Sequence, residues 1–393
     1  MKFVVIVGDG MADEPLAALS NKTPLQVAKT PNMDQIAKEG RTGLARTIPE
    51  GMPAGSDVAN LSVMGYDPRK YYTGRAPLEA AAMGIKLAKE DIAFRCNLVN
   101  VMDGIMVDYS AGHISSLEAR ELIESLKPSM PEHRLYAGVS YRNLLVLKTG
   151  EKAICTPPHD ITDRSIRDHL PSGKDSELLR QLMDASKPVL AMHPVNLKRM
   201  AEGKRTANLI WLWGQGPIPS LPTFQEKYGL KGAVISAVDL LKGIGVYADL
   251  EVIKVPGATG TIDTNYQGKV QALFDSLDRV DFVFLHVEAP DEAAHAGDIR
   301  LKIKAIELFD ECIVGPIIKG LQVLGNEWRV CVLPDHPTPI AIKTHTNDPV
   351  PFSIMGHGIE SDQVISFDEI AVKQGRYGLI EATAIIEIMT EIQ

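Results

Sequence analysis

The feature that most constrains the fold is a continuous run of β-branched residues within Lys2–Val7. A run of this kind, with no alternation of apolar and polar residues, is typical of a strand buried on both faces of a parallel sheet. Asn208–Trp213, Phe282–Val287 and Arg329–Leu333 have the same character, and long helical patterns separate them. Strands that alternate with helices predict an α/β fold, with a mostly parallel sheet covered by helices on both faces.

Several helices can be placed from their end signals. Thr30 is the expected N-cap of a helix that begins at Pro31 and ends at Gly40. Longer helical patterns cover 263–277 and 298–324, and Pro316 predicts a kink in the second of them.

The segment 89–205 has a different pattern, which predicts a small inserted α+β domain. Asp103-Gly104 lies between two strand-like runs and is a strong signal for a β-hairpin. The other elements expected there are a helix over 116–127 and strands over 135–139 and 143–148. We therefore expect one large domain made of residues 1–88 and 206–393, interrupted by the domain at 89–205.

Composition excludes several classes of protein. The formal net charge is −9 and the chain has no cluster of basic residues, which argues against a nucleic-acid-binding protein. No apolar stretch is long enough to span a membrane, since a span needs roughly 18 residues or more. The four cysteines are far apart and form no CxxC motif, as expected for free thiols in a reduced compartment. We expect a cytoplasmic protein, and the composition leaves its oligomeric state open.

Three aspartates follow predicted core strands. Asp9 and Asp335 come directly after two of them, and Asp291 comes shortly after a third. Ligand sites of open α/β sheets lie at the carboxyl ends of the strands. Each aspartate alone could equally be a turn or helix-capping residue, but the three together indicate a site.

Histidines accompany these aspartates. His295 lies four residues after Asp291, on the same face if a helix begins there, and His336 directly follows the aspartate of the last strand. His345 follows in a polar loop. Carboxylate and imidazole ligands without thiolates suit manganese, zinc, iron or magnesium ions. His286, inside a predicted strand, is interpreted as a core residue or one that supports the site from behind.

Ser56 is a candidate nucleophile in the motif Gly55-Ser56-Asp57-Val58-Ala59-Asn60. It is expected at or next to the N-cap of an apolar helix, where free N–H groups and the helix dipole attract phosphate. A serine hydroxyl needs a base or a metal ion to become an effective nucleophile. Taken alone, this segment could also be a plain helix cap.

The motifs also occur in a recognisable order. They are Gly8-Asp9-Gly10, Gly55–Asn60, Tyr72-Thr73-Gly74-Arg75, Asp291 with His295, and Pro334-Asp335-His336. Together they resemble the cofactor-independent phosphoglycerate mutases of the archaeal type, a branch of the alkaline phosphatase superfamily, over essentially the whole chain. The resemblance implies an alkaline-phosphatase-like core and identifies the inserted domain with a cap over the substrate.

The resemblance also implies two divalent metal ions, with Mn²⁺ expected first and Mg²⁺, Zn²⁺ or Co²⁺ as alternatives. One ion is assigned to Asp291, His295 and His345, and the other to Asp9, Ser56, Asp335 and His336. In this family the serine takes the phosphoryl group from 3-phosphoglycerate. The glycerate then reorients beneath the cap and receives the group on its 2-hydroxyl. The implied partner is thus a small phosphorylated metabolite.

Residues that bind the substrate are assigned on weaker patterns. Arg75 could hold a phosphate or carboxylate through two parallel hydrogen bonds. Arg142, His159 and Asp160 resemble family positions that face the cleft, where His159 and Asp160 could move protons to and from hydroxyl groups. Each could equally be a surface or turn residue.

Some positions depart from the family pattern, most clearly Glu288, where a lysine is expected after the histidine of the strand. Similar departures occur in relatives that resemble homoserine kinases, which transfer phosphate from ATP on the same core. An ATP-dependent homoserine kinase and a plain phosphomonoesterase are therefore the alternative enzymes. A catalytically inactive binding protein is disfavoured because the full set of metal-site residues is present.

Overall fold

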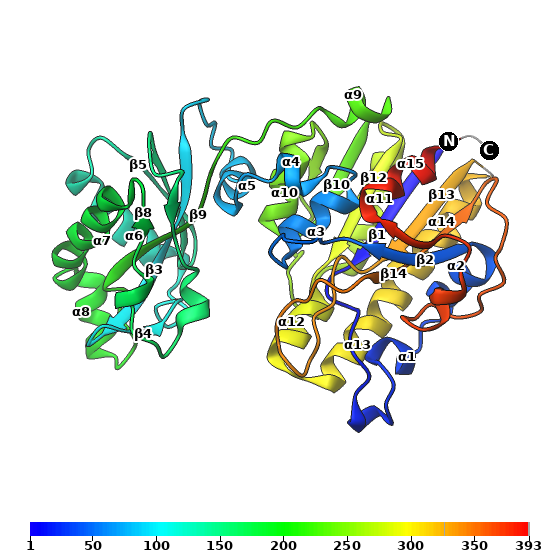
Figure 1. The fold of residues 1–393 in the computed structure, drawn as a ribbon, viewed down its shortest axis with the longest axis horizontal. Helices are drawn as coiled ribbons and strands as arrows, with labels where there is room; N and C mark the ends of the chain where they lie inside the picture. The colour runs from blue at the N-terminus through cyan, green and yellow to red at the C-terminus, as the bar shows by residue number, and fades with distance from the viewer. Residues whose placement is uncertain (326, 392–393) are drawn as a thin grey trace. The chain divides into compact units, whose positions relative to one another are not determined.

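The computed structural model describes residues 1–325 and 327–391. The chain divides into two compact units, the first formed by Met1–Tyr72 with the chain from Ser220 onward, and the second by Thr73–Pro219 (Figure 1). The inserted unit thus extends further at both ends than the segment 89–205 expected from the sequence. The extension contains α5 (Arg75–Ala82) and β9 (Leu209–Pro217), which pack on each other and on β3 (Ile92–Met102).

The first unit contains an eight-stranded sheet in the order β11-β10-β12-β1-β13-β14-β2-β15. In that order the strands are Glu251–Ile253, Gly232–Ile235, Phe282–Val287, Lys2–Gly8, Trp328–Leu333, Val350–Gly356, Arg41–Arg46 and Gly378–Glu381. Within the described residues only β14 runs against the others. The predicted mostly parallel sheet is confirmed, and β1 lies near its centre.

Helices cover both faces of this sheet, as predicted (Figure 1). On one face α2, α11, α13 and α14 share a core with Val4, Ile6 and the matching residues of the neighbouring strands. These helices are Pro31–Glu39, Tyr266–Leu277, Ile299–Phe309 and Gly315–Leu324. On the opposite face lie α3, α10 and α15, which are Ser56–Val63, Asp239–Tyr247 and Ile385–Thr390.

Two helix signals have a different physical basis from the one expected. Thr30 stands at the N-cap of α2, but its side chain makes no capping hydrogen bond. The carboxylate of Asp310 accepts hydrogen bonds from the N–H groups of Asn32 (3.2 Å) and Met33 (2.7 Å) instead.

Asp310 also begins a π-helical turn, Asp310–Val314, which joins α13 to α14 just before Pro316. This wider turn accommodates the proline, so the helical pattern continues to Leu324.

The second unit is built on an antiparallel sheet of β3, β4 (Ile105–Asp108), β5 (Arg134–Val139), β6 (Arg142–Leu147) and β9. The predicted hairpin between β3 and β4 is present, and its turn residues Asp103 and Gly104 both have positive φ (49° and 75°). The predicted helix is α6 (Ser116–Leu126), which begins with a capping box.

One strand was assigned to the wrong sheet. β9 was expected to return the chain to the large parallel sheet, but it pairs antiparallel with β3 in the second unit. Trp211 and Trp213 of β9 lie in the core of that unit. A run of apolar residues predicts a buried strand but does not specify its partner, because pairing depends on distant residues.

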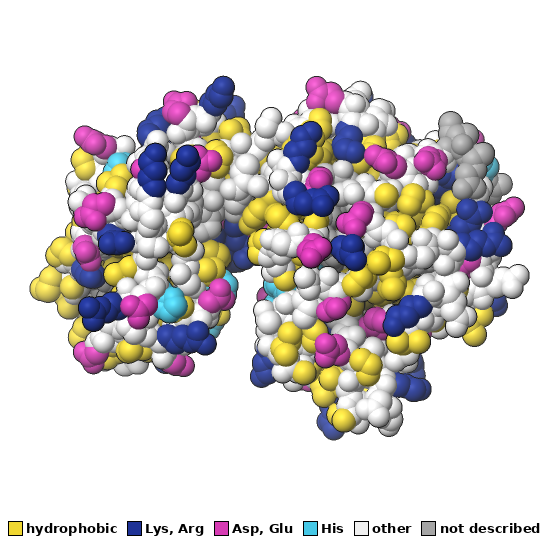
Figure 2. Space-filling view, in the orientation of Figure 1, with side chains coloured by type: hydrophobic (Ala, Val, Ile, Leu, Met, Phe, Trp, Pro, Cys, Tyr) yellow, Lys and Arg dark blue, Asp and Glu magenta, His cyan; other side chains and the backbone are white. Residues whose placement is uncertain are grey.

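The surface agrees with the charge pattern of the sequence. On the face shown in Figure 2, basic and acidic side chains are interspersed over each unit, so this face of the described residues presents no continuous basic surface. Within the described chain, no helix combines the length and the apolar character that crossing a membrane requires.

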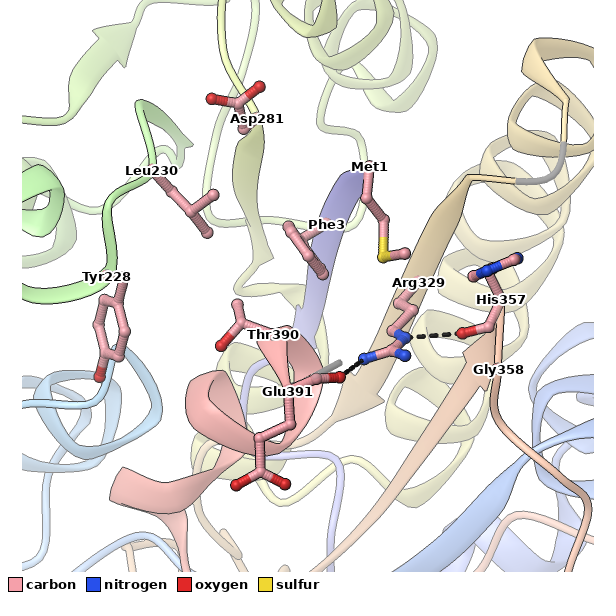
Figure 3. A pocket seen from close by; sticks show the side chains of 10 residues that line it. All are labelled: Met1, Phe3, Tyr228, Leu230, Asp281, Arg329, His357, Gly358, Thr390 and Glu391. Carbon is pink, nitrogen blue, oxygen red and sulfur yellow. Dashed lines mark hydrogen bonds between the residues drawn. The ribbon is translucent and has the colours of Figure 1, made fainter. Parts of the chain in front are cut away.

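A cavity of about 400 Å³ opens at the amino end of β1, beside Met1 and Phe3 (Figure 3). Arg329 of β13 lines it, and its guanidinium donates to the backbone carbonyls of His357 (2.7 Å), Met389 (2.9 Å) and Glu391 (2.6 Å). Two of these hydrogen bonds, to Met389 and Glu391, satisfy carbonyl groups at the end of α15. The cavity therefore lies at the edge of the sheet opposite to the carboxyl ends of the strands.

Candidate active site

The central strand β1 pairs with β12 on one side and β13 on the other, so their carboxyl ends meet. Asp9 follows β1, Asp335 follows β13, and α12 (Ala289–Ala296), which begins directly after β12, carries Asp291. The three aspartates predicted from the strand ends therefore lie at one edge of the sheet. All three are at least 95% buried, so their charges are removed from water.

The first group of converging side chains is Asp291, His295 and His345. Nε2 of His295 lies 3.1 Å from Oδ2 of Asp291 and 3.0 Å from Nε2 of His345. Nε2 of His345 is 3.6 Å from Oδ1 of Asp291. The spacing of four residues in α12 places His295 on the face of Asp291, as the sequence predicted, and the loop after β13 provides His345.

Two further groups share Asp9. One consists of Asp9, His286 and Asp335, and the other of Asp9, Asp291 and His336. Nε2 of His286 is 3.0 Å from Oδ2 of Asp9, and Nε2 of His336 is 3.4 Å from Oδ1 of the same carboxylate. Within each group the potential ligand atoms lie within 4.8 Å of one another. From the sequence we did not expect His286 among the ligands, because a single histidine within an apolar strand is usually a core residue.

The electrostatics of the cluster favour a cation. Burial raises the pKa of the Asp9 carboxyl well above its usual range, and the charges of Asp335 and Asp291 raise it further. Burial lowers the pKa of His286 and of His336, so both imidazoles favour the neutral form that binds metal ions. A divalent ion would relieve the repulsion among the carboxylates.

Within the described chain, two buried polar atoms of the cluster lack hydrogen bonds, as expected for atoms that bind a metal ion. Among the described residues, Oδ1 of Asp9 and Nε2 of His286 are buried and make no contact with hydrogen-bond geometry, although polar atoms lie 3.4 Å and 3.0 Å from them. Buried polar atoms without a partner are rare, because their desolvation is not compensated. Acceptor atoms that converge without hydrogen-bond geometry are expected where lone pairs point at one cation.

Ser56 lies next to these ligands. It is the first residue of α3, and its Oγ is 3.0 Å from Nε2 of His336. One turn later, the side-chain amide of Asn60 donates to the carbonyl of Ser56 (2.8 Å) and to Oδ2 of Asp335 (2.7 Å). The start of α3 is thus joined to the end of β13 by hydrogen bonds. The predicted nucleophile stands at a helix N-terminus, with the candidate metal ligands around it.

The predicted substrate residues lie in the second unit. Arg95 of β3 is buried, and burial is the largest cause that lowers the pKa of its guanidinium. The charge of Glu79 opposes this change, and the charges of Arg75 and Arg142 add to it. The Arg95 guanidinium stacks over Trp213 (4.4 Å to the ring centroid) and lies 3.1 Å from the Glu79 carboxylate. Arg95 is therefore close enough to Arg75 and Arg142 for their charges to act on it. The only signal for it in the sequence is a charge within an apolar strand.

The other two predicted residues are neighbours in the same unit. Nε2 of His159 is 3.6 Å from Oδ1 of Asp160, and its ring contacts Trp213 (5.2 Å between centroids) and Tyr109 (6.0 Å). The ring of His159 is thus held between two aromatic side chains of the second unit.

Comparison with known proteins identifies the family to which the chain belongs. Residues 37–196 match the profile of the 2,3-bisphosphoglycerate-independent phosphoglycerate mutases. A protein of that name from Methanothrix thermoacetophila is 63% identical over 389 residues, which cover 99% of each chain. The chain belongs to this family.

Two solved structures extend the family comparison to the fold. A protein from Pyrococcus horikoshii has a TM-score of 0.86 and 32% identity, over 99% of this chain and 96% of its own. The cofactor-independent phosphoglycerate mutase of Thermoplasma acidophilum has a TM-score of 0.66 and 28% identity, over 99% of both chains. The resemblance to the mutase family that the motifs indicated is confirmed.

The departure at Glu288 also has a structural context within this mutase fold. Lys269 of α11 is buried, and its Nζ donates to the carbonyl of His286 (2.9 Å). Burial lowers the pKa of Lys269 to about 8, and the charge of Glu288 opposes that change. Glu288 therefore interacts with a cation of the chain itself. The comparisons give the homoserine kinase alternative no support.

Proposed function

We propose that the protein is an isomerase that interconverts 3-phosphoglycerate and 2-phosphoglycerate through a phosphoserine at Ser56. One observation carries the proposal: the Ser56 hydroxyl, at the N-terminus of α3, lies 3.0 Å from His336 within a cluster of buried carboxylates and imidazoles. The relative from Methanothrix thermoacetophila, similar over 99% of both chains, bears the name of this reaction.

Two divalent ions are part of this proposal. Asp291, His295 and His345 would hold one, and Asp9, Ser56, Asp335 and His336 the other, with His286 as a further candidate ligand. Bound there, such ions would neutralise charge on the transferring phosphoryl oxygens and would lower the pKa of the Ser56 hydroxyl. Mn²⁺ is the first candidate because the resemblance to the mutase family implies it, and the carboxylate and imidazole ligands suit Mn²⁺ as well as Zn²⁺ or Mg²⁺.

The bond-making and bond-breaking steps are assigned to residues of the chain. Oγ of Ser56 forms a bond to phosphorus while the bond from phosphorus to O3 of the glycerate breaks, and that oxygen takes up a proton. In the second half the 2-hydroxyl loses its proton and its oxygen forms a bond to phosphorus while the bond from phosphorus to Oγ of Ser56 breaks. Oγ then takes up a proton, which restores the serine hydroxyl. N–H groups at the start of α3 stabilise phosphoryl oxygens in both halves. Asn60 keeps the serine oriented through its hydrogen bonds.

The second unit has the remaining roles in the proposal. Arg75 and Arg142, together with Arg95, are the proposed partners of the substrate carboxylate. His159 and Asp160 are the proposed carriers of protons for the glycerate hydroxyls. We propose that this unit acts as the cap that keeps water from the phosphoserine, which would favour mutase over phosphomonoesterase activity.

The test of the reaction is a comparison of kcat/KM for 3-phosphoglycerate with kcat/KM for homoserine in the presence of ATP. We expect the first value to be larger by at least about 100-fold, because only the correct substrate satisfies the buried polar groups of the site. Release of inorganic phosphate, measured in the same assay, should be a small fraction of turnover. A larger kcat/KM for homoserine, or phosphate release equal to substrate consumption, would contradict the proposed function.

A further inference from the structure

We infer that Thr338 is a positioning residue that fixes the tautomer of His336 and links the two groups of candidate metal ligands. The inference rests on the proposed function. Thr338 is fully buried in the loop after β13 and lies between two ligands. Its hydroxyl donates to Oδ1 of Asp291 at 2.6 Å, and its Oγ1 is 3.1 Å from Nδ1 of His336.

Counting protons assigns the direction of both hydrogen bonds. In the 2.6 Å hydrogen bond between Thr338 and Asp291, the Thr338 hydroxyl is the donor and Oδ1 of Asp291 is the acceptor. The single hydroxyl proton of Thr338 is therefore used towards Asp291, and the hydrogen bond to His336 requires Nδ1–H as its donor.

The tautomer determines what the other nitrogen can do. With its proton on Nδ1, the neutral imidazole of His336 has a free lone pair on Nε2. Nε2 lies 3.0 Å from Oγ of Ser56 and 3.4 Å from Oδ1 of Asp9. The lone pair thus points into the cluster, where it can bind an ion or orient the serine hydroxyl. The other tautomer would place a proton there.

The loop that holds Thr338 is anchored from two sides. Its N–H donates to the carbonyl of Ala12 (3.1 Å), and its own carbonyl accepts from Nζ of Lys302 (2.9 Å). Lys302 is fully buried and forms an ion pair with Asp13 (2.8 Å). These contacts tie the loop after β13 to the loop after β1, which carries Asp9.

Gly10 shows how closely the two loops approach. It has a positive φ of 61°, and a Cβ atom there would lie 2.6 Å from Oγ1 of Thr338 and 2.5 Å from Oδ1 of Asp291. Only glycine leaves room for this contact. The position of the Thr338 hydroxyl is therefore determined by the backbone on both sides of it.

The experiment measures the affinity of metal-free protein for Mn²⁺ by titration calorimetry. Thr338→Val keeps the shape of the side chain but removes both hydrogen bonds, whereas Thr338→Ser keeps the hydroxyl. We expect Thr338→Val to weaken binding by about 10–100-fold, as is usual when a residue that orients a metal ligand is lost. Thr338→Ser should restore most of the affinity.

Thr390→Val is the matched control. Among the described residues, the Thr390 hydroxyl donates only to backbone carbonyls of α15 (2.9 and 3.1 Å), beside the cavity of Figure 3. Its affinity for Mn²⁺ should equal that of the wild type. Wild-type affinity in Thr338→Val would overturn the role of Thr338 and leave the proposed function intact. A wild-type protein that binds no Mn²⁺, Zn²⁺ or Co²⁺ would overturn both the metal centre and this inference.

Discussion

Replacing Ser56 with alanine should lower turnover of 3-phosphoglycerate by several orders of magnitude, because the attacking oxygen is lost. Turnover is measured under saturating substrate, and folding by thermal unfolding. Gly55, rather than Ser56, occupies the N-cap position of α3. The variant should therefore lose less stability than the roughly 0.5–2 kcal/mol that removal of a capping side chain costs.

Ser62→Ala is the control for this variant. Ser62 is a buried serine of the same helix but is not among the candidate metal ligands, and its replacement should leave turnover near that of the wild type. Near-normal turnover in Ser56→Ala would refute the assignment of the nucleophile.

Removal of metal ions should abolish turnover, and addition of Mn²⁺ should restore it. Without a cation, the carboxylates of Asp9, Asp291 and Asp335 repel one another within a buried cluster. Loss of the ions should therefore also lower the melting temperature. At a Mn²⁺ concentration 100 times the Kd, binding is worth about 2.7 kcal/mol per site.

The measurement combines activity, calorimetry and elemental analysis of the same chelator-treated sample. Fe²⁺, Co²⁺, Zn²⁺ and Mg²⁺ are added in parallel, and the ion that restores the highest kcat/KM identifies the preferred metal. Full activity in protein shown by elemental analysis to be metal-free would contradict a metal-dependent reaction.

Much of the site could be predicted from sequence because its determinants are local. Asp9 and Asp335 are placed by the ends of β1 and β13, and the spacing of Asp291 and His295 puts both on one face of α12. Strand ends and helical spacing are short-range properties. The same reasoning placed Ser56 at the start of α3.

Other features depend on contacts between residues far apart in sequence. The apolar pattern of β9 predicts a core strand. Its partner β3 lies more than 100 residues earlier, so the sequence could not show to which sheet β9 belongs. Asp310 replaces Thr30 as the hydrogen-bonding cap of α2 from a position 280 residues away. His286 looks like a core residue until the fold brings Asp9 within 3.0 Å of it. The pattern of apolar residues contains none of these pairings.

The most direct test of the account is to identify the residue that becomes phosphorylated during turnover. Enzyme mixed with 3-phosphoglycerate is quenched within milliseconds, digested and analysed by mass spectrometry, with Ser62→Ala and Ser56→Ala treated in parallel. The account predicts phosphate on the peptide that contains Ser56, at that residue, in the wild type and in Ser62→Ala but not in Ser56→Ala. Phosphate on another residue, or turnover by the wild type without any phosphoserine, would contradict it.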